Sequence, residues 1–203
     1  MKLLGCVIVC LGLIPPAFAN DSEPPNPPED WQRNFDAKQS EITTGVGVFF
    51  SPFVATKGRP TVNYAGPLVQ YGYMLNDLEK HGPLDGNLEL LTEVFGAGVF
   101  TGHGTYLAGT TFWLRYNVVP PRWRVSPYFQ IGAGVTFTDV DHRFFGQTFN
   151  FNLNAATGVR YFIDTRCSLN AEYRFEHVSN ANLADHNLGI NSQGAVLSVS
   201  WFF

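Results

Sequence analysis

Hydrophobic and polar side chains alternate residue by residue over most of the chain between Glu41 and Phe203. Alternation with a period of two is the pattern of a β-strand whose two faces meet different surroundings. Eight segments of roughly ten to fifteen residues show this pattern, at 41–51, 62–75, 86–99, 105–118, 124–138, 148–162, 166–179 and 191–203. No convincing amphipathic helix separates them, so the sequence predicts an all-β domain.

The polar face of these segments carries charges of both signs rather than the lysines of a soluble surface. They are Glu89, Glu93, Arg115, Arg124, Arg160, Glu172, Arg174 and Glu176. Balanced Arg and Glu are typical of a narrow interior in which buried charges must pair. The apolar face would then point outward into lipid. We therefore predict an eight-stranded antiparallel up-and-down transmembrane β-barrel whose lumen is filled by side chains.

Aromatic residues gather on the apolar face near one end of the predicted strands. They are Tyr73, Tyr116, Trp123, Tyr161 and Trp201. Trp and Tyr favour the headgroup region of a membrane, which suits an apolar ring with a polar tip. The chain ends on Phe203 after alternating apolar residues, a pattern that resembles the signal read by the barrel-assembly machinery. These features predict the outer membrane of a Gram-negative bacterium as the location.

The N-terminal region differs from the rest. Residues 1–19 have a charged start, an apolar stretch and the small-residue pattern Ala17-Phe18-Ala19, which predicts a cleaved signal peptide. Residues 20–40 are rich in proline and acidic residues and predict a flexible leader. The barrel is expected to occupy residues 41–203. Removal of the signal peptide would leave Cys167 as the only cysteine, so no internal disulfide or zinc site is expected.

Composition excludes some classes of partner. Only 15% of the residues are charged, and the formal net charge is −4. A strongly basic protein that binds nucleic acid is therefore disfavoured.

The alternation fails at one place, where polar residues occupy the outward row. On segment 166–179 these are His177 and Ser179, and on segment 191–203 they are Asn191 and Gln193. Residues two apart on a strand share a face at about 6.5–7 Å, so a histidine nitrogen can reach the serine hydroxyl. Asn191 on the neighbouring strand can accept the other imidazole N–H, which gives the nucleophile, base and orienting group of an acyl-transfer enzyme. A polar rim at the membrane interface explains the same residues equally well on spacing alone.

The motif His177-Val178-Ser179-Asn180-Ala181, followed by Asn187-Leu188-Gly189-Ile190-Asn191-Ser192 and a final Trp201-Phe202-Phe203, resembles the lipid A 3-O-deacylases of the PagL family. The resemblance covers most of residues 86–203. It implies an outer-membrane esterase that removes the 3-hydroxyacyl chain at position 3 of lipid A in lipopolysaccharide. Ser179 would be the nucleophile, His177 the general base and Asn180 an oxyanion donor.

The chain departs from the family pattern at Asn191, where the family has a glutamate. Asp185 in the preceding loop is a possible substitute acid. Lys57 and Arg59, in the first predicted surface loop, are candidates for contacts to lipid A phosphates. No cofactor or metal is expected, because His103, His142 and His186 lie in separate loops. A non-enzymatic structural or adhesive barrel and a phospholipase-like esterase that needs calcium remain the alternatives.

Overall fold

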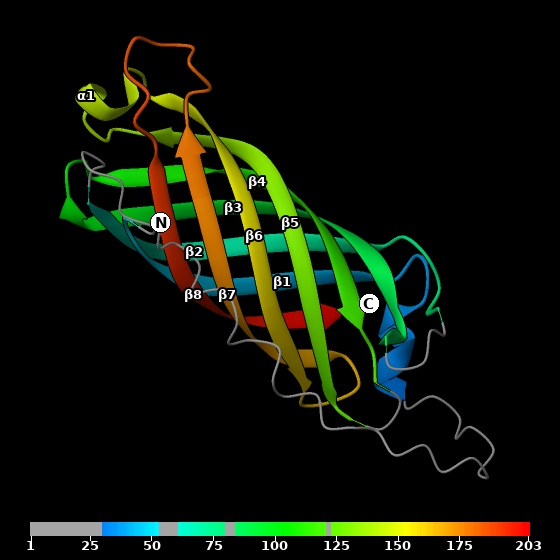
Figure 1. Cartoon of the computed structure of the whole chain (residues 1–203). Helices are drawn as coiled ribbons and strands as arrows, with labels where there is room; N and C mark the ends of the chain where they lie inside the picture. Colours follow the sequence, from blue (N-terminus) through cyan, green and yellow to red (C-terminus); the bar gives the residue numbers. More distant parts are fainter. Residues whose placement is uncertain (1–29, 53–60, 80–83, 121–122) are drawn as a thin grey trace, which may run out of the picture.

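The computed structural model describes residues 30–52, 61–79, 84–120 and 123–203, and these form a closed antiparallel β-barrel of eight strands (Figure 1). The predicted signal peptide, residues 1–19, lies outside the described residues. The strands are β1 (Ser40–Phe50), β2 (Val62–Met74), β3 (Gly86–Gly102), β4 (Tyr106–Val118), β5 (Val125–Thr138), β6 (Phe149–Phe162), β7 (Cys167–Ser179) and β8 (Ile190–Phe202). A 3-10 helix, η1 (Asp30–Phe35), precedes β1, and a short helix, α1 (His142–Phe145), lies between β5 and β6.

Each strand pairs with its neighbours in sequence, and β1 also pairs with β8 to close the barrel. Closure leaves no unpaired strand edge, which is what a sheet in lipid requires. The predicted all-β, up-and-down, eight-stranded barrel is confirmed. No helix among the described residues is long and apolar enough to cross a membrane.

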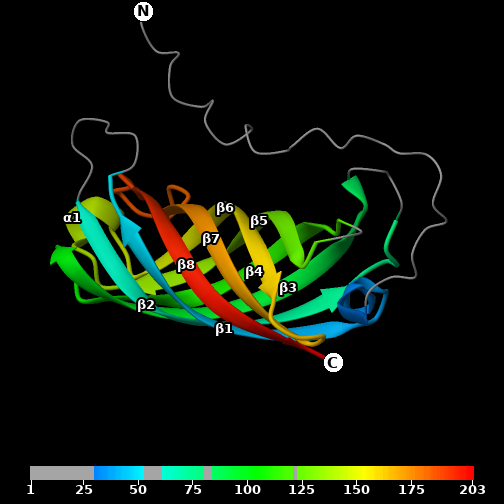
Figure 2. The same cartoon turned by 90° about the horizontal axis from the view of Figure 1, so that it is seen from below.

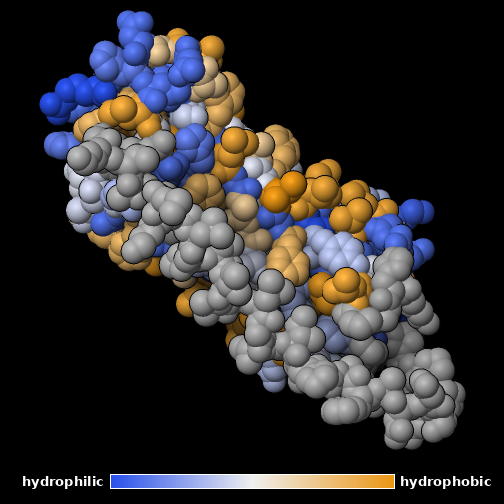
Figure 3. All heavy atoms as spheres, viewed as in Figure 1, coloured by the Kyte–Doolittle hydropathy of each residue, from blue (hydrophilic) through white to orange (hydrophobic). Residues whose placement is uncertain are grey.

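The outer wall is apolar and the interior is polar, the reverse of a soluble barrel. Figure 3 shows hydrophobic residues over the strands and hydrophilic residues gathered at the end that carries α1. Exposed hydrophobic side chains occur on all eight strands, among them Val46, Val69, Leu90, Val94, Phe112, Phe129, Ile131, Leu153, Leu169 and Leu197. The aromatic residues predicted to form a band lie at the opposite end, close to the C-terminus, where Tyr73, Trp123, Tyr161 and Trp201 are exposed.

Ion pairs fill the lumen in two groups. In the first, Arg115 and Arg160 lie between Glu41 and Glu89. Arg115 Nη1 is 3.1 Å from Glu41 Oε1 and 3.3 Å from Glu89 Oε2, and Arg160 pairs with both carboxylates. All four side chains are buried, so each charge has its compensation inside the barrel rather than in water.

The second group is built around Arg174 on β7. Its guanidinium lies 2.8 Å from Glu93 Oε1 and 2.7 Å from Glu172 Oε1, and it stacks on the Trp113 ring at 4.6 Å. Tyr128 and Gln130 also donate hydrogen bonds to the Glu172 carboxylate. Four strands are thereby joined across the lumen, and β7 is fixed from the inside.

Two expectations about the charges need correction. Arg124 is exposed and precedes β5, so it lies at the end of the barrel rather than in the lumen row. Glu41, absent from the expected charged row, is a central acceptor of the first group.

The predicted flexible leader is wrong for residues 30–40. Trp31 and Phe35 of η1 are buried, and they pack with Met74, Val119, Phe162 and Phe202 across the end of the barrel near the C-terminus. Figure 2 shows η1, in blue, beside that end. Asn87 donates a hydrogen bond to the carbonyl of Phe35, which ties η1 to β3. Aromatic side chains that follow the proline-rich residues in sequence therefore close the lumen at this end.

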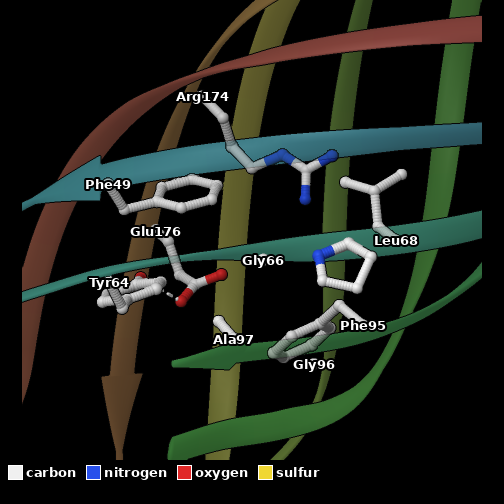
Figure 4. Close-up of a pocket in the computed structure, with 10 residues that line it drawn as sticks. Phe49, Tyr64, Gly66, Leu68, Phe95, Gly96, Ala97, Arg174 and Glu176 are labelled. Atoms are coloured by element: carbon white, nitrogen blue, oxygen red, sulfur yellow. Dashed lines mark hydrogen bonds between the residues drawn. The ribbon is translucent and has the colours of Figure 1, made fainter. Parts of the chain in front are cut away.

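A small pocket lies inside the barrel wall where β2 and β3 are not continuously paired. Gly66 and Pro67 have no partner in β3, between the pairs Ala65↔Gly98 and Leu68↔Phe95. Figure 4 shows Glu176 directed into this pocket, where it accepts a hydrogen bond of 2.6 Å from Tyr64. The free space is about 20 Å³, room for roughly one water molecule and none for an acyl chain.

The ion pairs predict a large effect of removing the one cation in the second group. Arg174→Met leaves Glu93 and Glu172 buried without their counter-charge, and we expect a loss of about 3–5 kcal/mol in the free energy of unfolding. Urea unfolding of the barrel in lipid vesicles, followed by tryptophan fluorescence, measures it. Arg166→Met, at an exposed position in the β6–β7 turn, is the control and should change stability by less than about 0.5 kcal/mol. Equal stability of the two variants would contradict the role given to Arg174.

Candidate active site on the outer wall

His177 and Ser179 lie on the outer face of β7, near the end that carries α1. Their neighbour Val178 points inward and is buried, as is its register partner Ile190 on β8. Both belong to an apolar cluster that fills the lumen at this end. A slip of one residue would put Val178 and Ile190 outside and bury His177, so this cluster fixes the faces of both strands.

Asn191 reaches the same outer surface from β8. It is the register partner of His177, so the two side chains stand side by side across the strands. Ser179 lies two residues beyond His177 on β7, opposite Phe151 of β6. His177, Ser179 and Asn191 are all half-buried, so the group is open to the surroundings of the barrel.

The three side chains form one hydrogen-bonded chain. His177 Nδ1 lies 2.6 Å from Asn191 Oδ1, and His177 Nε2 lies 3.1 Å from Ser179 Oγ. An amide oxygen only accepts hydrogen bonds, so His177 Nδ1 carries the proton and its N–H donates a hydrogen bond to Asn191 Oδ1. In the neutral ring Nε2 then has a lone pair directed at the serine hydroxyl. The expected proximity of the three residues is therefore present, with the histidine in the tautomer that a general base needs.

The position along β8 gives the depth of the site. Asn191 and Trp201 are both on the outer face and about ten residues apart, which is ~33 Å along a strand. With the tilt of ~40° usual for membrane barrels, this corresponds to ~25 Å along the membrane normal, the height of a typical apolar band. With Trp201 at one boundary of the membrane, Asn191 lies at the other boundary.

Gly189 makes room beside the histidine and was not among the expected site residues. Its φ of +64° is in the left-handed region. A Cβ there would lie 3.3 Å from His177 Cε1 and 3.5 Å from Ser179 Cβ. Glycine therefore suits the tight approach of the β7–β8 loop to His177 and Ser179. Only its place in the motif Asn187-Leu188-Gly189-Ile190-Asn191-Ser192 marked it in the sequence.

Asn180 does not have the arrangement expected of an oxyanion donor. Its side chain is buried, and its amide nitrogen donates to the carbonyls of Phe145 and, at 2.8 Å, His186. Its backbone N–H donates to Asn187 Oδ1 at 3.1 Å. Both amide hydrogens and the backbone hydrogen are thus in use, and none is left for an oxyanion. The structure corrects this expectation: Asn180 joins the β7–β8 loop to α1.

Other contacts hold the neighbouring loops. Asp139, just after β5, accepts hydrogen bonds from the backbone N–H groups of Thr105 and Tyr106 and from the Thr105 hydroxyl. Slight burial favours the neutral acid, but these hydrogen bonds outweigh it and lower the pKa of Asp139. Asp141 caps α1, and its hydrogen bonds with Arg143 lower its pKa to about 2. Both carboxylates are therefore ionised at neutral pH and hold the loops at this end.

The remaining expected residues are not brought to the site. Lys57 and Arg59 lie outside the described residues. Asp185 is exposed in the β7–β8 loop, and the acceptor position on His177 Nδ1 is taken by Asn191. Among the described residues, no group of three His, Cys, Asp or Glu side chains is arranged to hold a metal ion.

Loss of the Asn180 side chain should loosen the surface loops and leave the barrel folded. Asn180→Ala removes the bonds to the carbonyls of Phe145 and His186, and we expect limited proteolysis within 181–188 to become at least about tenfold faster, as for the loss of one or two hydrogen bonds. Leu183→Ala, at an exposed position in the same loop, is the control. Identical cleavage rates in the two variants would show that Asn180 does not anchor the loop.

Comparison with known proteins identifies a family and several similar folds. The model of the family described as lipid A 3-O-deacylase (PagL) matches residues 66–200, more than half of the chain, with all of β7 and most of β8. No curated protein matches the chain.

Three solved structures are similar in fold at low sequence identity. Neisserial surface protein A shares 17% identity with a TM-score of 0.59, covering 81% of this chain and 97% of its own. The outer membrane enzyme PagL shares 16% identity with a TM-score of 0.55, covering 78% and 97%. The N-terminal β-barrel domain of Pseudomonas aeruginosa OprF shares 15% identity with a TM-score of 0.50, covering 82% and 98%. These likenesses support the closed β-barrel fold. By its family match the chain belongs to the lipid A 3-O-deacylase (PagL) family.

Proposed function

We propose that this protein is an outer-membrane serine esterase that hydrolyses the ester-linked 3-hydroxyacyl chain at position 3 of lipid A. Membership of the PagL family supports a hydrolase that acts on lipid A. The observation that carries the finer proposal is the hydrogen-bonded chain Ser179–His177–Asn191 on the lipid-facing wall. A polar rim without catalytic function would not require this tautomer or this order of donors and acceptors.

The location of the three residues suits a lipid substrate. Lipid A is anchored in the outer leaflet, with its ester bonds just below the headgroups. A nucleophile at the outer boundary of the apolar band meets such an ester without extraction of the lipid from the membrane. Near the site the wall offers apolar side chains for the acyl chain, with Leu153 on β6 level with His177 and Leu197 on β8 nearer the membrane centre.

The geometry supports a two-step acyl transfer. Ser179 Oγ attacks the ester carbonyl carbon while His177 Nε2 takes the hydroxyl proton, and the imidazolium donates that proton to the departing sugar oxygen. The products of this step are the free 3-hydroxyl of lipid A and an acyl-Ser179 ester. Water, deprotonated by His177, then attacks the acyl ester, and the imidazolium returns the proton to the departing Ser179 Oγ as the 3-hydroxy fatty acid is released. Asn191 Oδ1 holds Nδ1–H throughout and keeps the ring oriented.

Removal of the nucleophile should abolish the reaction. In cells that produce Ser179→Ala, we expect lipid A to keep the 3-hydroxyacyl chain that wild-type protein removes, because nothing else in the group attacks the ester. Mass spectrometry of extracted lipid A measures this. Thr92→Ala, which removes an outward hydroxyl on β3, is the matched control, and heat-dependent gel mobility shows that each barrel is folded. Unchanged lipid A in cells with folded wild-type protein would contradict the proposal and favour a structural barrel. Loss of acyl chains from phospholipids alone would favour a phospholipase.

Substitution of Asn191 tests how the histidine is held. A neutral amide stabilises the imidazolium less than a carboxylate does, so Asn191→Glu should raise kcat, by about tenfold. Asn191→Leu removes the acceptor for Nδ1–H and should lower kcat by about 10–100-fold. Initial rates with purified protein and lipid A in detergent micelles measure both. If Asn191→Leu has wild-type kcat, Asn191 does not orient His177.

A further inference from the structure

A second polar pair lies on the outer wall, immediately below the catalytic group. Gln193 is on the outer row of β8, two residues nearer the membrane centre than Asn191, and Tyr173 is on the outer row of β7. The Tyr173 hydroxyl donates a hydrogen bond of 2.5 Å to Gln193 Oε1. The remaining outward residues of these two strands toward the C-terminal end are mostly apolar.

This hydrogen bond fixes the orientation of the Gln193 amide. Since Oε1 accepts from Tyr173, the Nε2 group with its two hydrogens is the end left to meet a ligand. Within the part of the chain that the structure describes, Nε2 has no acceptor. Two residues of a tilted strand correspond to ~5 Å of depth, so the Gln193 Cα lies inside the apolar band. A donor in hydrocarbon without a partner is costly, and such groups in membrane proteins are typically functional.

The acyl chain of the substrate passes this depth. From an ester held at Ser179, the chain descends along the wall toward the membrane centre. Apart from the ester itself, the only polar group near the carbonyl end of a 3-hydroxyacyl chain is its 3-hydroxyl. An unsubstituted fatty acyl chain has none.

We propose that Gln193 Nε2 donates a hydrogen bond to the 3-hydroxyl of the acyl chain that is cleaved, and that Tyr173 positions Gln193 for this contact. The pair would make the enzyme selective for 3-hydroxyacyl esters over plain acyl esters. This inference rests on the proposed function, because it places the ester at Ser179.

The reach of the side chains is consistent with this contact. Gln193 is the register partner of Phe175, which lies four residues before Ser179 on β7, or ~13 Å along the strand. The glutamine side chain spans about 5 Å and the serine side chain about 2.5 Å, which leaves a gap of about 5–6 Å when both point toward each other. The ester carbonyl carbon beside Ser179, the acyl carbons that lead to the 3-hydroxyl, and one hydrogen bond of ~3 Å fill such a gap.

The test compares two substrates that differ only in the hydroxyl. Purified protein in detergent micelles is given lipid A analogues with either a 3-hydroxytetradecanoyl or a tetradecanoyl chain at position 3, and kcat/KM is measured for each. We expect the wild type to prefer the hydroxylated substrate by about tenfold, the value of one hydrogen bond. In Gln193→Leu the ratio should fall to near one, with the larger loss on the hydroxylated substrate. Tyr173→Phe should lower the ratio partly, and Thr92→Leu on β3 should keep it.

The outcomes separate this inference from the proposed function. If the folded wild type cleaves neither analogue, the proposed function fails. If the wild type cleaves both equally well, or Gln193→Leu keeps the wild-type ratio, the esterase proposal stands and the hydroxyl contact is wrong. Equal losses on both substrates in Gln193→Leu would also overturn the contact, because they would give Gln193 a role that does not depend on the hydroxyl.

Discussion

Pairing of buried charges inside the barrel is the constraint on which the rest of the structure depends. A sheet closed in lipid must put its polar side chains into the lumen, and a lumen of eight strands is too narrow to hydrate them. Arg115 and Arg160 compensate Glu41 and Glu89, and Arg174 compensates Glu93 and Glu172. These contacts join strands that are far apart in sequence and make the barrel a filled, rigid scaffold rather than a pore.

Because side chains fill the lumen, the candidate site lies on the outer wall of the barrel. Strand alternation turns Val178 and Ile190 inward, where they are packed, and this leaves His177, Ser179 and Asn191 outside at the boundary of the apolar band. The loops add support from above, since Asn180 links the β7–β8 loop to α1 and Gly189 admits that loop close to the histidine. The polar pair Tyr173–Gln193 extends the same surface toward the membrane centre. The proposed reaction on a membrane lipid thus needs no cavity in the barrel.

The strands and the outward row of the site were predictable because both follow from a period of two. Side chains alternate on every strand whatever its partners, so segment 166–179 alone shows that His177 and Ser179 share the outer face. The pairing of His177 with Asn191 needs only the register of one hairpin. Counting back from Phe203 gives the outer face of β8, and the structure agrees.

What sequence reasoning missed depends on contacts between distant residues. The burial of Trp31 and Phe35 in η1 requires Phe162 on β6 and Phe202 on β8. The sequence around η1 does not indicate these distant partners. Glu41 lies near the start of a strand, and its ion pair with the distant Arg160 cannot be read from the sequence. Asn180 follows Ser179 in the motif, which favoured an oxyanion role, yet its side-chain donors are taken by a carbonyl of α1 and by a carbonyl of its own loop.

The central claim is that Ser179 is a nucleophile activated by His177 on the lipid-facing wall. The most direct measurement is mass spectrometry of the protein after outer membranes are treated with a long-chain alkyl fluorophosphonate, which reacts with activated serines. The account predicts one phosphonyl adduct, on Ser179, and its loss in a folded His177→Asn variant. An unlabelled Ser179 in the folded wild-type protein, or equal labelling in His177→Asn, would contradict it.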